Sequence, residues 1–178
     1  MIIAVTGRIS AGETTLCELL ERRGFKRLSL SDILRDMLRE QGKPVVRENL
    51  RKLGDSLRKK MGKAAIAKLA WEKMKGGGDW VVDSVYTYEE GEFLRSKGAY
   101  LVGVVAPVEL RYQRSLNRGD GYSSIQEFQE DDEKDRELGI DRMVAEADFV
   151  ISNDGTIKQL EEKVEGMLKT ISSSPSRS

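Results

Sequence analysis

Histidine is absent from this chain of 178 residues, and cysteine occurs only once. Without histidine there is no Ser-His or Cys-His catalytic pair and no histidine-ligated metal site, which leaves the chemistry of carboxylates, lysine, arginine and bound Mg²⁺. The single cysteine, Cys17, excludes an intramolecular disulfide and favours an intracellular, cytoplasmic protein. We expect Cys17 itself to lie in the core.

A net charge of either sign is also missing, because Lys and Arg total 30 and Asp and Glu total 30. A neutral chain has no overall field to attract nucleic acid or an anionic membrane, so we expect neither as a partner and assign anion binding to local clusters. No segment approaches the ~20 apolar residues that span a bilayer. The length suits one domain, which we place at residues 1–171 with a flexible polar tail at 172–178.

Short apolar runs alternate with amphipathic stretches, which predicts a parallel sheet covered by helices. The expected strands are 2–6, 27–30, 80–83, 100–106 and 149–152. The expected helices are 14–23, 31–40, 46–75 with a break near Gly62, 89–97, 107–118, 125–138 and 156–168. This order predicts a doubly wound, five-stranded α/β fold with a small helical lid at about 112–142 and a ligand at the carboxyl ends of the strands.

The first expected strand runs into a glycine loop, Gly7-Arg8-Ile9-Ser10-Ala11-Gly12-Glu13-Thr14-Thr15. With lysine in place of Glu13 this would be the P-loop pattern G-x-x-x-x-G-K-[ST], in the strand–loop–helix context that the pattern requires. Backbone N–H groups and the helix N-terminus then attract phosphate. We expect this loop to bind the phosphates of ATP, with Thr14 as a Mg²⁺ ligand and Thr15 on a phosphate. An ordinary glycine turn is the alternative.

Glu13 occupies the position of the lysine that contacts the β and γ phosphates. A carboxylate repels phosphate, and one unit-charge contact at ~4 Å is worth about 4 kcal/mol at an effective dielectric constant of ~20. Three arrangements would reconcile Glu13 with the loop. It swings away while Arg8 supplies the charge, it binds Mg²⁺ or a cationic partner, or the chain is a disabled variant. An acidic residue also suits the first turn of any helix. We expect impaired catalysis.

Three further segments resemble dephospho-coenzyme A kinases: 32–35 (Asp-Ile-Leu-Arg), the lid residues Gln113, Arg114 and Arg118, and 147–155 (Ala-Asp-Phe-Val-Ile-Ser-Asn-Asp-Gly). Segments 31–35, 48–51 and 135–139 resemble a largely archaeal group of kinase-like P-loop proteins of the UPF0200 type. The resemblance covers about residues 1–168 and implies a P-loop NTPase fold like that of nucleoside monophosphate kinases.

The resemblance implies that Arg35 meets the acceptor substrate and that Asn153 and Gly155 line the adenine pocket. An Asn-Asp-Gly triplet is also simply a good turn. Tyr86 takes the place of an arginine that the family's D-G-x-R pattern sets against the substrate phosphate, so a second cationic contact is lost.

Phosphoryl transfer needs charge neutralisation and an aligned acceptor hydroxyl. Arg114, Arg118 and Arg136 are the candidate lid cations over the phosphates, with a salt-bridged helix surface as the alternative. Asp32 is the candidate base or acceptor-orienting group. Asp83 is the candidate Mg²⁺ and substrate partner at a strand end. A helix N-cap is the alternative for Asp32, and a turn cap is the alternative for Asp83.

The sequence therefore predicts an ATP- and Mg²⁺-dependent phosphotransferase of the nucleotide or dephospho-coenzyme A kinase type, acting on a small nucleotide-like or coenzyme-like acceptor and impaired by Glu13. The alternatives are a nucleotide-binding pseudoenzyme and an ATPase module whose 46–75 helical segment contacts a protein partner. The sequence leaves the acceptor and the oligomeric state open.

Overall fold

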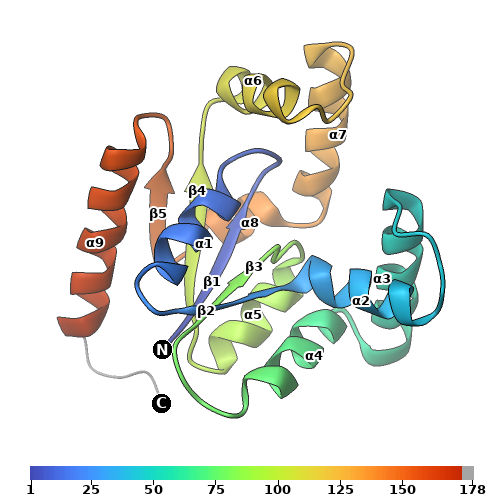
Figure 1. Cartoon of the computed structure of the whole chain (residues 1–178), viewed down its shortest axis with the longest axis horizontal. Helices are drawn as coiled ribbons and strands as arrows, with labels where there is room; N and C mark the ends of the chain where they lie inside the picture. The colour runs from blue at the N-terminus through green and yellow to red at the C-terminus, as the bar shows by residue number, and fades with distance from the viewer. Residues whose placement is uncertain (174–178) are drawn as a thin grey trace.

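A parallel sheet forms the centre of the molecule. The computed structural model describes residues 1–173, apart from the side chains of Arg47 and Asp135, and in this part of the chain five parallel strands pair in the order β2-β3-β1-β4-β5 (Figure 1). Their bounds are β1 (Ile2–Gly7), β2 (Lys26–Ser29), β3 (Trp80–Asp83), β4 (Tyr100–Val105) and β5 (Phe149–Ser152). The predicted five-stranded parallel sheet is confirmed. β1 lies between β3 and β4, so the glycine loop leaves the sheet at its topological switch point.

Helices cover both faces of the sheet, and each face has its own apolar core (Figure 1). Ile3 and Val5 belong to one core and Ala4 to the other, because side chains alternate along a strand. Cys17 is buried in the first core, as expected, and burial raises the pKa of its thiol. The first face is covered by α1 (Glu13–Glu21) and α9 (Ile157–Ser173), and the second by α2 (Leu30–Glu40), α4 (Ala65–Met74), α5 (Tyr88–Ser96) and α8 (Ile140–Ala145).

The lid consists of two helices beyond the carboxyl end of β4, at the top of Figure 1: α6 (Val108–Arg118) and α7 (Ile125–Glu137). Phe128 is fully buried between Tyr112 and Tyr122, with ring centroids 5.7 and 5.2 Å from its own, so the lid has a small aromatic core. Within residues 1–173, no helix is both long enough and apolar enough to cross a membrane.

The predicted break in the 46–75 segment is confirmed, since α3 (Arg47–Met61) ends before Gly62, whose φ of 91° suits glycine. Two other expectations were wrong. The short helix α8 was not predicted, and α9 continues beyond residue 168 to Ser173 because Ile171, 3% exposed, extends its apolar stripe. Residues 172 and 173 therefore belong to a helix and not to a tail, and the rest of the expected tail, 174–178, lies outside the described residues.

Candidate active site

The glycine loop between β1 and α1 has a tightly turned backbone. Ser10 (φ 62°) and Gly12 (φ 109°) both have positive φ, and the Ala11 amide donates to the Arg8 carbonyl at 2.9 Å. Positive φ at a residue with a side chain persists only where the surrounding structure imposes it. The conformation at Ser10 is therefore held by contacts from outside the loop.

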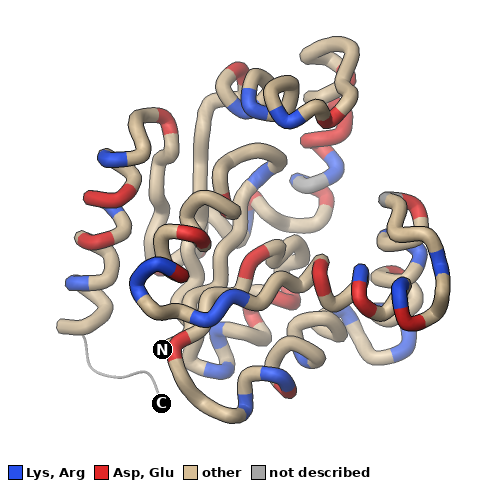
Figure 2. Tube along the Cα trace, in the orientation of Figure 1, with Lys and Arg blue, Asp and Glu red and all other residues tan. Residues whose placement is uncertain are grey.

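Arginines of α6, whose basic residues are blue in Figure 2, make some of these contacts. Arg111, Arg114 and Arg118 recur at helical spacing, and the first two donate to the carbonyl oxygens of Ile9 and Ala11 at 3.0 and 3.2 Å. The lid thus binds acceptor groups of the loop. The first N–H groups of α1 have no partner within the helix, which makes them donors for an anion.

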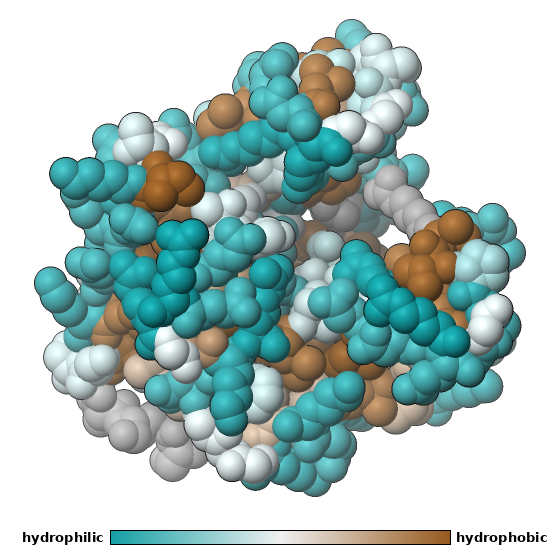
Figure 3. All heavy atoms as spheres, viewed as in Figure 1, coloured by the Kyte–Doolittle hydropathy of each residue, from teal (hydrophilic) through white to brown (hydrophobic). Residues whose placement is uncertain are grey.

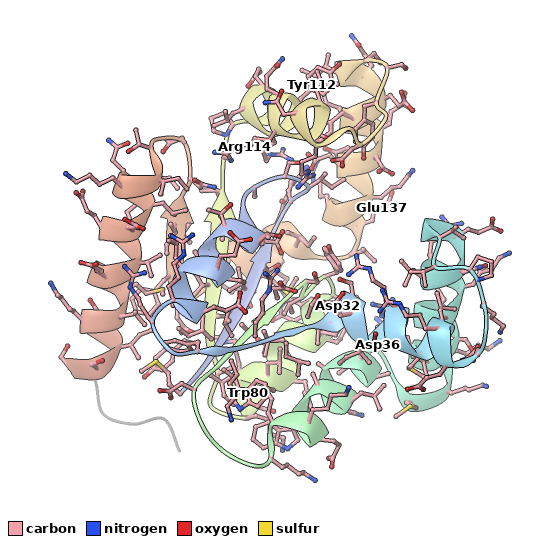
Figure 4. The ribbon with its side chains drawn as sticks, viewed as in Figure 1. Asp32, Asp36, Trp80, Tyr112, Arg114 and Glu137 are labelled. Atoms are coloured by element: carbon pink, nitrogen blue, oxygen red, sulfur yellow. The ribbon has the colours of Figure 1, made fainter. Side chains whose placement is uncertain are left out.

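Arg114 and Arg118 differ in how their charge is balanced. Arg118 donates to the Ser10 hydroxyl at 2.7 Å and is paired with Asp120 at 2.6 Å. Among the side chains that the structure describes, Arg114 has no ion-pair partner; burial lowers the pKa of its guanidinium, although the charge of Asp154 opposes this. In Figure 4 its side chain points from α6 toward the loop that precedes α1. Arg114 is therefore a lid cation without a direct carboxylate contact among the described side chains.

Asn153, directly after β5, is hydrogen-bonded to the same loop. Its Nδ2 donates to the Ala11 carbonyl at 2.9 Å, its own carbonyl accepts from Arg114 at 2.7 Å, and the residue is buried. Gly12 makes room for this contact, because a Cβ on Gly12 would lie 1.9 Å from Asn153 Nδ2. The structure therefore places Asn153 against the loop, while the role at adenine stays a prediction.

Glu13 begins α1 and lies close to the start of the loop. A Cβ on Gly7 would lie 3.4 Å from Glu13 Cγ and 2.7 Å from the Val104 carbonyl oxygen. The Glu13 side chain is half-buried. The Cγ of Glu13 therefore lies near Gly7, at the start of the loop.

Arg8 is directed to carboxylates beyond the loop. It forms a two-pronged contact with Asp141, with N–O distances of 2.7 and 2.6 Å, and it donates to Asp132 at 2.9 Å. Hydrogen bonding to Asp141 raises the pKa of Arg8, although its partial burial opposes this. Its charge is therefore already balanced, and Arg8 does not replace the missing lysine in this conformation.

Asp83 ends β3 and is almost completely buried. Its Oδ2 accepts from both Nε and Nη2 of Arg27, with the Nε contact at 2.7 Å. Its Oδ1 is buried and has no hydrogen-bond partner among the described residues. A buried acceptor without a partner is costly unless water or a metal-bound ligand completes it. Asp83 thus keeps one oxygen available for such a group.

We expect Arg27→Met to destabilise the protein by about 3–5 kcal/mol, because it leaves the Asp83 carboxylate buried and without its cation. Urea unfolding of the variant and the wild type measures this loss. Arg22→Met is the matched control, since Arg22 is 69% exposed and lies 4.0 Å from Glu161; it should cost at most about 1 kcal/mol. Equal losses in the two variants would contradict a buried Arg27–Asp83 pair.

A polar cluster lies at the carboxyl ends of β2 and β3. The hydroxyls of Ser29, Ser31 and Ser84 are 3.0–3.3 Å apart, and Ser84 has a φ of 58°. Arg35 donates to Ser31 at 3.2 Å and to Asp32 at 2.5 Å. The serines were missed in the sequence, where the only signal is the spacing of Ser29 and Ser31. Ser84 joins them only because β2 and β3 are neighbours.

Asp32 is open to solvent. Its side chain is 60% exposed, and it lies at the start of α2 (Figure 4). Figure 3 shows the molecule hollowed between the lid and the α2–α3 side, with apolar residues on part of the α3 side. The role of Asp32 toward an acceptor stays a prediction.

The remaining predicted residues occupy varied positions. Thr14 is exposed in the first turn of α1, and Thr15 is half-buried. Tyr86 is 36% exposed after β3. Gly155 starts the turn into α9, where a Cβ would lie 2.1 Å from Gln159 Oε1. This close approach of Gln159 is enough to account for glycine at position 155, with no need for a ligand there.

Arg136 does not join the other lid arginines. Its side chain is 65% exposed and lies near carboxylates of α7 and α8. It faces solvent on α7, and its role over the phosphates stays a prediction. Conversely, three residues that hold the loop were not predicted from the sequence: Arg111, Asp132 and Asp141. Their charges are unremarkable within a strongly charged segment, so no sequence signal distinguished them.

Comparison with known proteins assigns the chain to a family. Residues 3–137 match the family described as an AAA domain. A UPF0200 protein of Sulfurisphaera tokodaii is 34% identical over 173 residues, covering 96% of this chain and 97% of that protein.

Two solved kinases share the fold. Dephospho-CoA kinase from Campylobacter jejuni is similar with a TM-score of 0.62 and 19% identity, covering 96% of each chain. Shikimate kinase from Acinetobacter baumannii, in complex with shikimate, is similar with a TM-score of 0.61 and 19% identity, covering 95% of this chain and 93% of that one. The chain therefore has the fold of P-loop kinases and belongs to the AAA-domain family and to the UPF0200 proteins.

Proposed function

We propose that this protein binds Mg²⁺-ATP at the glycine loop and transfers the terminal phosphoryl group, slowly in its present sequence, to a small nucleotide-like or coenzyme-like acceptor. The observation that carries this proposal is the held loop. Arg111, Arg114 and Asn153 bind its carbonyl groups, which places the Arg114 guanidinium beside the N-terminus of α1, where an anion is favoured. An ordinary glycine turn needs no such support.

The residues present fit a Mg²⁺ ion. Thr14 has an exposed hydroxyl in the first helical turn, and Asp83 has a buried Oδ1 without a hydrogen-bond partner among the described residues. These two would hold the ion directly or through water. When bound, Mg²⁺ would neutralise charge on the phosphate oxygens. Arg27 already balances Asp83, so the ion would rely on the ATP phosphates for much of its attraction.

Asp32 is the group we assign to the acceptor. Its exposed carboxylate would accept the proton of the acceptor hydroxyl as that oxygen attacks the γ-phosphorus. The bond from the γ-phosphorus to the leaving oxygen of ADP breaks in the same transfer. Arg35, held beside Asp32 and Ser31, would orient the acceptor. Arg114 would stabilise negative charge on the transferred group.

A nucleotide-binding pseudoenzyme is the second candidate, and Glu13 favours it. Its side chain stays near Gly7, where a carboxylate opposes the phosphates. Tyr86 offers no charge where the related kinases use arginine. Binding without turnover would distinguish this candidate from a slow kinase.

The test is a transfer assay with radiolabelled ATP, Mg²⁺ and a panel of nucleosides, nucleotides and coenzyme precursors. Asp32→Asn should lower turnover by about 100-fold or more, the usual contribution of a general base. Asp36→Asn is the matched control, because Asp36 lies one turn later on α2 and pairs with Arg39 as Asp32 pairs with Arg35 (Figure 4). Its turnover should not change. Nucleotide binding with no product, even from Glu13→Lys, would establish the pseudoenzyme instead.

A further inference from the structure

A network of four charged side chains joins the lid to the phosphate loop. Asp132 on α7 is 3% exposed and accepts hydrogen bonds from two arginines, from Arg111 at 2.5 and 2.8 Å and from Arg8 at 2.9 Å. Arg8 also holds Asp141, at the start of α8. Two more exposed groups lie at its edge, Glu133 at 3.6 Å from Arg8 and Arg136 at 3.7 Å from Asp141, so three positive and three negative charges balance at the junction of loop, lid and α8.

The two arginines of the network act at neighbouring residues of the loop. Arg8 is a loop residue, and Arg111 donates to the carbonyl of the next residue, Ile9, at 3.0 Å. Arg111 also donates from Nε to the Ala106 carbonyl at 3.1 Å, at the end of β4. Asp132 thus acts on two consecutive loop residues through two guanidinium groups.

The inner half of the network is well shielded from water. The side chains of Arg111 and Asp132 are 7% and 5% exposed, and the Arg111 guanidinium lies 5.6 Å from the centre of the Phe128 ring in the lid core. Removing one member of a buried pair leaves the other without compensation. Without the Asp132 charge, the two guanidinium groups would face each other, with Asp141 and the exposed Glu133 as the remaining counterions, both beside Arg8.

We propose that Asp132 is a positioning residue that docks the lid on the phosphate loop before a nucleotide arrives. Lid and loop then form one unit in the free protein, and a phosphate chain meets a preformed site. Preorganisation of this kind raises affinity because the ordering cost is already met. The effect on nucleotide affinity rests on the proposed function, whereas the docking of lid and loop does not.

Amide hydrogen exchange without nucleotide tests the docking. Asp132→Asn keeps the side-chain shape and removes the charge, so the Ala11 amide, which is bonded to the Arg8 carbonyl, should exchange at least 10-fold faster. Amides in β1 and β4 should keep their wild-type rates. Glu130→Gln removes one charge from the exposed face of the same helix and should change neither set. Unchanged exchange at Ala11, or an equal rise in loop and strands, would overturn the proposal.

A second variant covers the case in which Asp132→Asn does not fold. Asp132→Glu keeps the charge but displaces the carboxylate by one methylene, so Ala11 exchange should still rise several-fold. Wild-type exchange in this variant would contradict a positioning role.

Titration with Mg²⁺-ATP separates this proposal from the proposed function. Asp132→Asn should raise the Kd at least 10-fold, and Glu130→Gln should leave it unchanged. If the wild type binds no nucleotide while loop exchange responds as expected, the proposed function fails and the docking role stands. If the wild type and Asp132→Asn bind nucleotide equally well, the proposal that Asp132 positions the loop for nucleotide is refuted.

Discussion

Glu13→Lys is expected to tighten Mg²⁺-ATP binding by about 100-fold or more. The substitution exchanges a repulsive charge for an attractive one beside the phosphates, and each such contact at ~4 Å is worth about 4 kcal/mol before solvent screening reduces it. Tenfold in affinity corresponds to about 1.4 kcal/mol, so even a strongly screened contact produces this change. Calorimetric titration of the two proteins with a non-hydrolysable ATP analogue and Mg²⁺ measures it.

The expected stability change of Glu13→Lys has the opposite sign. A lysine in the first turn of α1 opposes the helix dipole, so the nucleotide-free variant should lose about 0.3–1 kcal/mol. If Glu13→Lys binds nucleotide more tightly but is less stable without it, the higher affinity comes from contact with the ligand and not from a more stable fold.

Glu18→Lys is the matched control for charge. Glu18 is an exposed residue of the same helix, so the substitution makes the same change in net charge away from the loop. It should alter affinity less than threefold, and Glu13→Gln should fall between the wild type and Glu13→Lys. Equal gains from Glu13→Lys and Glu18→Lys would mean that the overall charge, and not position 13, limits binding.

Gly12→Ala is expected to abolish nucleotide binding and to cost about 2–4 kcal/mol of stability. Gly12 has a φ of 109°, where a side chain adds about 1–2 kcal/mol of strain. The new Cβ would also lie 1.9 Å from Asn153 Nδ2 and would displace its hydrogen bond to Ala11. Urea unfolding and nucleotide titration of the variant measure the two losses.

Gly24→Ala separates backbone strain from steric conflict. Gly24 also has a positive φ, of 93°, but a Cβ there would meet no atom within 4 Å. Gly24→Ala should lower the free energy of unfolding only by the backbone strain, about 1–2 kcal/mol, and leave nucleotide binding intact. The double variant Gly12→Ala with Asn153→Ala removes the conflict and should recover part of the stability. A Gly12→Ala loss no larger than that of Gly24→Ala would contradict the Asn153 contact.

The loop therefore keeps its shape without the lysine of a P-loop. Its carbonyl groups are bonded to the lid and to Asn153, and none of these contacts involves residue 13. These contacts from the lid and from Asn153 therefore do not require a lysine at position 13.

Part of the candidate site could be read from the sequence because it lies on one continuous segment. The pattern from Gly7 to Thr15 follows an apolar strand and precedes a helix, and all three features are local. The carboxyl end of a parallel strand is also a general location for ligands, so Asp32 and Asp83 could be selected by their positions after strands. Their partners could not be predicted. Arg27 is 56 residues from Asp83, and nothing local distinguishes a charged residue in a short strand that forms a buried ion pair from one that does not.

By itself, the sequence determined the parallel α/β sheet, the glycine loop, the break at Gly62 and the reversed charge at Glu13, because hydrophobic periodicity, glycine and charge act over a few residues. Only the tertiary structure decided that Arg8 binds Asp132 and Asp141, that Arg111 and Arg114 hold the loop, and that Arg136 faces solvent. These outcomes depend on the path of the lid after β4, which brings groups 102 to 133 residues apart into hydrogen-bond contact. With 30 basic and 30 acidic residues, many pairings satisfy the same charges, and packing selects among them.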